Sequence, residues 1–153
     1  MSQRVEQRVP TAYELDAYTK CLDLTEFTFG VCKARDKNGE NHKHIPKRFG
    51  SIARQIEFLM TDMGADILKA NMLYVKDNLN TEERVRHYKR RLELQGKAVS
   101  VSYRLEHYMR VLHRQIEFAD STLSHWMELM WETRRLLIAW REKETKTLRS
   151  LQS

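Results

Sequence analysis

The stretch PKRFGSIARQIEFLMTDMGADILKANMLYV, residues 46–75, decides the fold of this 153-residue chain. Its apolar residues recur at alternating spacings of three and four, which is the pattern of a helix that packs against other helices through one face. Pro46 suits the first helical turn, where its missing N–H is not needed. The pattern therefore predicts a helix over about 46–77, with a buried stripe that comprises Phe49, Ile52, Ile56, Leu59, Met63, Ile67, Ala70 and Tyr74.

The residues before this stretch predict another helix, over about 12–35. TAYE, residues 11–14, matches a capping box, in which Thr11 and Glu14 satisfy each other's backbone amides. The buried stripe of this helix is expected at Leu15, Tyr18, Leu22, Thr25, Phe29 and Cys32. RDKNGENHKH, residues 35–44, is polar and rich in turn-forming residues, so it is expected to be a long loop. Residues 1–11 are expected to form an N-terminal extension.

Two further helices are predicted after residue 77. Asn80 is expected to cap a helix over about 81–114, and Glu82 and Glu83 place negative charge at the positive end of its dipole. A last helix is expected over about 118–142, followed by a polar tail at 143–153 that frays. The buried stripe of this last helix is predicted at Leu123, Trp126, Met130, Thr133, Leu137 and Trp140.

Composition and spacing together predict the fold class. With two prolines and five glycines, the chain offers few places where a helix must stop, which favours an all-α protein of long helices. Apolar spacings that average 3.5 favour nearly parallel packing, so residues 12–142 are expected to form one up-down-up-down four-helix bundle. The 81–114 helix carries two apolar seams, which place it either centrally in a monomer or against another subunit.

The charge of the chain favours an acidic partner. Its formal net charge is +6 and its pI is near 9.4, and nucleic acid is the usual partner of such proteins, although many basic proteins bind no polyanion. No apolar run approaches the roughly 18 residues of a membrane span. Cys21 and Cys32 lie about 16 Å apart on one predicted helix and cannot form a disulfide, which fits a reducing cytoplasm.

Basic side chains concentrate on one face of the 81–114 helix, where Glu93 is the only acid. Ordinary solvated helix faces mix charges, because opposite charges four residues apart stabilise a helix and like charges destabilise it. We therefore expect this face to bind a polyanion, with arginines that lie over apolar surface as the alternative. The expected contacts are Arg86, Lys89, Arg90, Lys97, Arg104, Arg110 and Arg114, with Lys47 and Arg48 at the start of the 46–77 helix as further phosphate contacts.

The sequence offers little for catalysis. It contains no Glu-x-x-His, no Cys-x-x-Cys and no glycine-rich phosphate loop. We therefore expect no enzyme activity, catalytic residue, metal, cofactor or small-molecule substrate. Glu106 falls on an apolar seam and is expected to form a salt bridge to a neighbouring helix, and the three tryptophans are expected to pack rather than to stack on bases.

Five short segments carry a family resemblance. IPKRF opens the 46–77 helix and ADILKAN lies near its end, RRLELQGKA and YRLEHYMRVLH follow in the 81–114 helix, and RRLLIAW lies in the last helix. In this order and spacing they resemble the four-helix-bundle family that includes the accessory variability determinant (Avd) of diversity-generating retroelements. The resemblance covers about residues 13–140. A sister branch, encoded within intervening sequences of large-subunit ribosomal RNA genes, shares the fold.

The resemblance implies a cytoplasmic, non-enzymatic protein of bacterial or phage origin. Such a protein would form a ring-like homopentamer and bind a reverse transcriptase and its template RNA during adenine-mutagenic cDNA synthesis. Carried over by position, Arg110, Arg135 and the pair Lys47 and Arg48 match basic residues of the family, and Trp140 matches its terminal tryptophan. The chain departs from the family at Arg134 and Ile138, where glycines are common. A structural bundle that recognises a protein partner and a ribosomal intervening-sequence protein are the alternative interpretations.

Overall fold

The computed structural model describes residues 12–33, 49–73, 75–76, 78–116 and 119–153. Four helices account for most of them: α1 (Ala12–Lys33), α2 (Gly50–Met72), α3 (Thr81–Gln115) and α4 (Asp120–Gln152). No strand occurs in these described ranges. The predicted capping residue Thr11, the loop at 35–44 and the pair Lys47 and Arg48 lie outside them.

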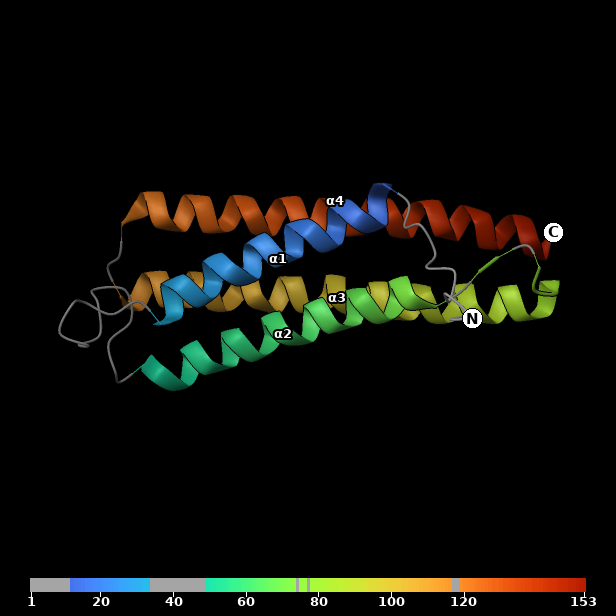
Figure 1. Ribbon diagram of the computed structural model, residues 1–153. Coiled ribbons are helices and arrows are strands. Elements are labelled where there is room, and N and C mark those ends of the chain that lie inside the picture. The colour runs from blue at the N-terminus through green and yellow to red at the C-terminus, as the bar shows by residue number, and fades with distance from the viewer. Residues whose placement is uncertain (1–11, 34–48, 74, 77, 117–118) are drawn as a thin grey trace, which may run out of the picture.

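The four helices form a bundle in which successive helices run in opposite directions (Figure 1). α3 packs against α2 and α4, and α1 packs against the same two helices. The predicted all-α four-helix bundle is therefore confirmed. α3 and α4 are longer than α1 and α2, and together they extend beyond them at the end of the bundle where the C-terminus lies (Figure 1).

The predicted stripes of α2 and α4 form the core. The largest side chains without solvent exposure are two tryptophans of α4, Trp126 and Trp140. Phe49, Ile52 and Leu123, at the ends of the two stripes, are half-buried and pack against the same core. The remaining predicted core residues of these two helices that the structure describes are fully or almost fully buried: Ile56, Leu59, Met63, Ile67, Ala70, Met130, Thr133 and Leu137.

The predicted stripe of α1 is displaced by one residue from the buried face, although two of its members, Tyr18 and Cys32, are half-buried against the core. Leu22 was expected in the core, but it is 49% exposed, and the buried face comprises Ala17, Cys21, Leu24, Thr28 and Val31. Small and polar side chains dominate this face because neighbouring groups lie close to it. A Cβ added at Gly64 of α2 would lie 3.8 Å from the Cys21 Sγ, and the Thr28 hydroxyl accepts a hydrogen bond from the Trp126 indole at 2.9 Å.

Helix α3 begins as predicted and buries both of its seams. The Asn80 side chain accepts a hydrogen bond from the Glu83 amide at 2.8 Å, which confirms the cap. Ala98, Leu105 and Met109 are fully buried, while Val99 and Tyr108 are half-buried against the core. Because α3 packs between α2 and α4, both seams find partners within one chain.

The predicted polar tail at 143–153 is wrong, since α4 continues to Gln152. Glu144 explains the difference. Its carboxylate is buried and accepts hydrogen bonds from Arg91 Nε at 2.8 and 3.0 Å and from Gln95 at 2.5 Å, so α3 holds this part of α4.

The same Arg91 explains why α2 ends at Met72 rather than near residue 77. Its Nη1 donates to the carbonyls of Ala70 and Leu73, at 3.0 and 2.8 Å, and so caps the helix.

Candidate nucleic-acid interface

The seven cations predicted on α3 all point into solvent. Arg86, Lys89, Arg90, Lys97, Arg104, Arg110 and Arg114 are exposed, and they define the basic face of α3. The helix places them together because they occupy three neighbouring heptad positions, one shared by Arg86 and Arg114, one by Lys89 and Arg110, and one by Arg90, Lys97 and Arg104. The residues opposite them, such as Arg91, Gln95 and Ser102, are buried against the other helices. The prediction that this face is turned outward is confirmed.

Three cations of the basic face have acidic partners. Arg90 pairs with Glu93 at 3.0 Å on the exposed surface of the same helix. Lys97 lies 3.7 Å from Asp66, a buried carboxylate of α2. Glu106 binds Arg110 at 3.3 Å. The Arg90–Glu93 pair is exposed on both sides, so it contributes little to stability and opens readily. The side chains of Lys97 and Arg110 are themselves 61% and 57% exposed, so a polyanion can reach them although Asp66 is buried and Glu106 is only 20% exposed.

The other four cations have no acidic partner among the described residues. Within the part of the chain that the structure describes, no acid forms an ion pair with Arg86, Lys89, Arg104 or Arg114. From Arg86 to Arg114 the helix rises about 42 Å at 1.5 Å per residue. The basic face is therefore an extended stripe of positive charge, as binding to a long phosphate backbone requires.

The remaining predicted contacts do not join this stripe. Lys47 and Arg48 lie outside the described residues. Arg135 is exposed on α4, where its guanidinium is held by Glu132 at 2.6 and 3.1 Å. These hydrogen bonds, more than the small opposing effect of burial, hold the pKa of Glu132 below its ordinary value. Arg135 also lines a groove with Lys20 of α1, so it belongs to the α1–α4 side of the bundle.

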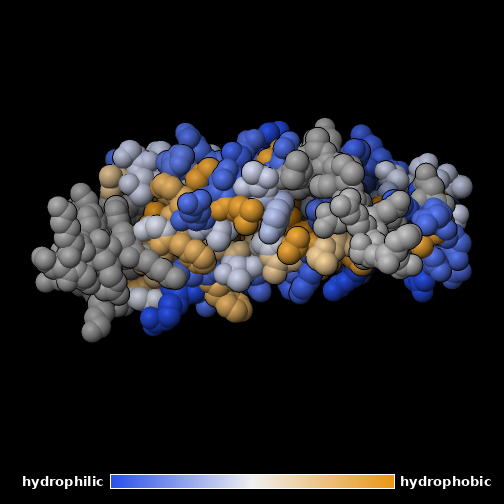
Figure 2. All heavy atoms as spheres, viewed as in Figure 1, coloured by the Kyte–Doolittle hydropathy of each residue, from blue (hydrophilic) through white to orange (hydrophobic). Residues whose placement is uncertain are grey.

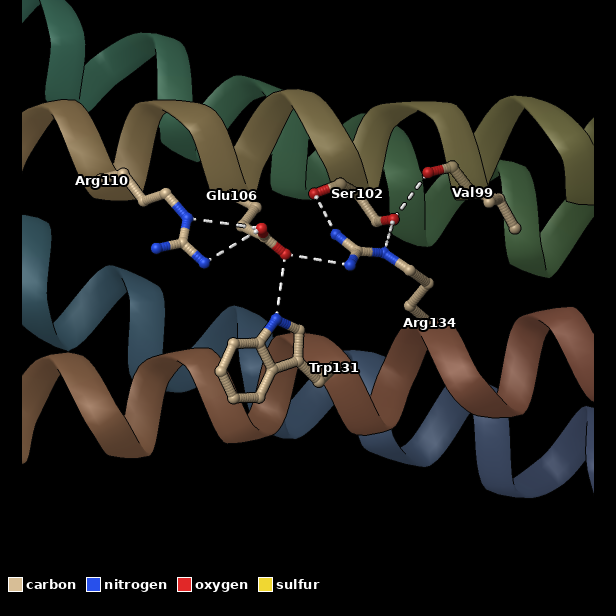
Figure 3. Close-up of polar contacts among 6 residues, drawn as sticks. All are labelled: Val99, Ser102, Glu106, Arg110, Trp131 and Arg134. Carbon is tan, nitrogen blue, oxygen red and sulfur yellow. Dashed lines mark hydrogen bonds and ion pairs between the residues drawn. The ribbon is translucent and has the colours of Figure 1, made fainter.

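Glu106 is the centre of a polar network that joins α3 to α4 (Figure 3). Its Oε1 accepts hydrogen bonds from Arg134 at 2.9 Å and from the Trp131 indole at 3.0 Å, while its Oε2 faces Arg110. Arg134 also donates to the Ser102 hydroxyl at 2.8 Å and to the Ser102 carbonyl at 3.2 Å. The salt bridge predicted for Glu106 is confirmed by its contact with Arg134 of α4.

The network sets the charge of Glu106. Burial alone would raise the pKa of this carboxyl, but hydrogen bonds from Arg134, Trp131 and Arg110 outweigh it and hold the pKa below the ordinary value of 4.5. Glu106 is therefore ionised at neutral pH and neutralises part of the charge of Arg134 and Arg110. Trp131 was expected to pack, but it is 47% exposed and its indole donates this hydrogen bond to Glu106.

A second cluster of cations lies beside the basic face and was missed from the sequence. An open groove of about 510 Å³ between α3 and α4 has Gly96, Val99 and Ile138 at its base. Its α4 wall carries Arg141, Glu142, Thr145, Lys146 and Arg149. Three cations and one carboxylate give the groove a net charge of +2. Sequence reasoning missed it because the polar composition of residues 143–153 predicted a frayed tail, although Leu148 and Leu151 continue the predicted stripe beyond Trp140 at helical spacing.

The described residues offer no metal site and no membrane span. No group of three or more histidine, cysteine or acidic side chains among them could hold a metal ion. None of the four described helices is both long and apolar enough to cross a membrane.

No protein-family model, curated protein or solved structure matches this chain.

Proposed function

We propose that this protein is a non-enzymatic RNA-binding subunit that acts by neutralising phosphates and by scaffolding. One observation carries the proposal: the seven cations of the basic face are all exposed, and four of them have no acidic partner among the described residues. Like charges four residues apart destabilise a helix, so this arrangement lowers the stability of α3 when no polyanion is bound. A phosphate backbone along the stripe offsets that cost.

The proposed context is a diversity-generating retroelement, on the basis of the resemblance to the Avd family. The protein would then bind the template RNA and the reverse transcriptase and support mutagenic cDNA synthesis, as a homopentamer in the cytoplasm. The four helices of the bundle and the exposed position of Arg110 are compatible with this role. Co-purification of a reverse transcriptase with the protein, in an RNA-dependent manner, would support the retroelement role. Binding of RNA without such a partner would support RNA binding alone.

The test of RNA binding is a charge reversal at two unpaired positions of the basic face. Arg86→Glu combined with Arg104→Glu is expected to weaken RNA binding by about tenfold or more at low salt, because two phosphate contacts become repulsive. The matched control, Arg54→Glu with Lys143→Glu, makes the same charge change at exposed positions of α2 and α4. Equal affinities of the two double variants in a filter-binding assay would contradict the proposal.

A protein-binding scaffold is the second candidate, and a different surface favours it. Large apolar side chains are exposed on α1 and α2: Leu22 at 49%, Phe58 at 62%, Leu68 at 39% and Met72 at 72%. Hydrophobic residues gather along the face that these two helices present (Figure 2). Exposed apolar patches of this kind mark protein interfaces. If nucleic acid does not co-purify at low salt, and the basic-face variants have the same RNA affinity as the parent protein, the protein-binding scaffold replaces RNA binding as the proposed function.

A further inference from the structure

The groove between α3 and α4 is bordered by a ridge of residues that lie one heptad apart on α3. Lys89, Gly96, Tyr103 and Arg110 follow one another at intervals of seven, which keeps them on the same side of a helix in a left-handed bundle. The ridge rises about 31 Å from Lys89 to Arg110. Because Lys89 and Arg110 also belong to the basic face, this ridge joins the basic face to the groove.

Gly96 lines the groove, and its lack of a side chain leaves space for the Arg141 guanidinium. A Cβ at this position would lie 3.4 Å from Nε and Nη2 of Arg141, so a larger side chain would displace the guanidinium that now lies over the glycine. Arg141 Nε is 3.4 Å from the Leu92 carbonyl, a long hydrogen bond that anchors it against α3. Lys146 and Arg149 follow on the α4 wall, and both are exposed. These three cations form a track that a phosphate backbone can follow.

Tyr103 lies outside the groove lining, one heptad or about 10 Å along α3 from Gly96, and presents an aromatic ring near the Arg141 end of this track. The Arg134 guanidinium lies 3.8 Å from the ring centroid and covers one face. The Tyr103 residue as a whole is still 55% exposed, so the other ring face is accessible. Arg134 is itself fixed by Ser102 and Glu106, which holds the stacked pair in place. A rigid exposed ring next to a row of cations is the arrangement with which proteins bind unpaired bases.

We propose that the α3–α4 groove binds single-stranded RNA, with the backbone along Arg141, Lys146 and Arg149 and a base stacked on the exposed face of Tyr103. The inference rests on the proposed function and specifies the form of RNA that is bound. A duplex can lie along the basic face, but its bases are paired and stacked on one another and cannot reach the Tyr103 ring.

The test compares a fluorescein-labelled unstructured 20-nucleotide RNA with a duplex of the same length, by fluorescence anisotropy on the full chain. Tyr103→Ala is expected to weaken binding of the single strand by about fivefold to a hundredfold, the range measured for loss of one stacked base, and to leave duplex binding unchanged. Tyr103→Phe keeps the ring and is expected to bind as the parent does. Circular dichroism confirms that each variant keeps its helical content.

A second arm tests the track itself. Lys146→Glu combined with Arg149→Glu is expected to weaken single-strand binding more than duplex binding, and Arg54→Glu is the control outside the groove. If Tyr103→Ala and the track variant bind the single strand as the parent does, while Arg86→Glu with Arg104→Glu abolishes binding, the inference fails and the proposed function stands. If the parent protein binds neither RNA, both fail.

Discussion

Arg91 of α3 and Glu144 of α4 form a buried ion pair, with Arg91 Nε at 2.8 and 3.0 Å from the two carboxylate oxygens. Arg91 has no solvent exposure and Glu144 has 6%. The Arg91 guanidinium also lies 5.5 Å from the centre of the Trp140 ring and donates to two carbonyls at the end of α2. One side chain thereby connects three helices at the end of the bundle where α3 and α4 extend beyond the others.

Removing Glu144 is therefore expected to be costly. Glu144→Ala removes the carboxylate that pairs with the buried Arg91 charge, and breaking a buried ion pair in this way costs about 3–5 kcal/mol in the free energy of unfolding. Urea denaturation measures it. Arg91→Met combined with Glu144→Met removes both charges and should cost less than the sum of the two single changes. Glu132→Ala, which breaks the exposed pair with Arg135, is the control and should cost less than about 1 kcal/mol.

The pKa of Glu106 predicts how stability depends on pH. Because this pKa lies below 4.5 in the folded protein, the ionised carboxylate stabilises the fold at pH values above 4.5, and this contribution is lost as the pH falls through the folded-state pKa. Glu106→Gln is expected to lower the free energy of unfolding at pH 7 by about 1 kcal/mol. It is also expected to reduce the loss of stability between pH 7 and pH 4. Urea midpoints at pH 7 and pH 4 test this, with Glu93→Gln on the exposed surface as the control. The same change in urea midpoint between pH 7 and pH 4 in both variants would contradict this prediction.

The buried hydrogen bond between Trp126 and Thr28 makes a separate prediction for the contact of α1 with α4. The Thr28 hydroxyl accepts from the indole at 2.9 Å and donates to the Leu24 carbonyl at 2.6 Å. Thr28→Val keeps the shape but removes the acceptor, which should cost about 1–3 kcal/mol because the indole N–H stays buried. Thr28→Ser retains the hydroxyl and is the matched control. Equal urea midpoints for the two variants would show that the hydrogen bond contributes nothing.

Apolar periodicity predicted the number of helices, the core faces of α2 and α4 and the outward direction of the basic face. It failed where polar or small residues are buried. The α1 face was misplaced because Ala17, Cys21 and Thr28 carry a weaker apolar signal than Leu22 and Phe29, although close contact with α2 and Trp126 requires residues of that kind.

The end of α4 was missed for a related reason. Glu144 is charged, and its burial depends on Arg91, which lies 53 residues earlier in the chain. A pairing at that distance leaves no local pattern. The groove cations Lys146 and Arg149 were missed with it, because their position follows from the same extension of α4. The sequence thus predicted the candidate site on α3 but not the half of it on α4.

Cys21 should be chemically inert in the folded protein. Burial, partly opposed by a hydrogen bond with Thr25, raises the pKa of its thiol to about 11, so about one molecule in a thousand carries the thiolate at pH 8. Cys32 is only half-buried. Iodoacetamide at pH 8 is therefore expected to label Cys32 first and Cys21 only after urea is added, as peptide mass spectrometry would detect. Equal labelling rates without urea would mean that α1 opens readily from the bundle.

Salt dependence gives the final prediction, because it counts bound phosphates without knowledge of the RNA sequence. If three to six of the exposed cations bind phosphates, affinity should fall about tenfold to a thousandfold between 50 and 200 mM salt. Arg86→Glu with Arg104→Glu should also reduce the slope of the logarithmic plot, by about 0.7 to 0.9 for each phosphate that is no longer bound. Tyr103→Ala should lower affinity and leave the slope unchanged, since a stacked base releases no counterion. Anisotropy titrations at four salt concentrations separate the two effects. If the affinity of the parent protein does not change with salt concentration, the cations of α3 do not bind the RNA phosphates.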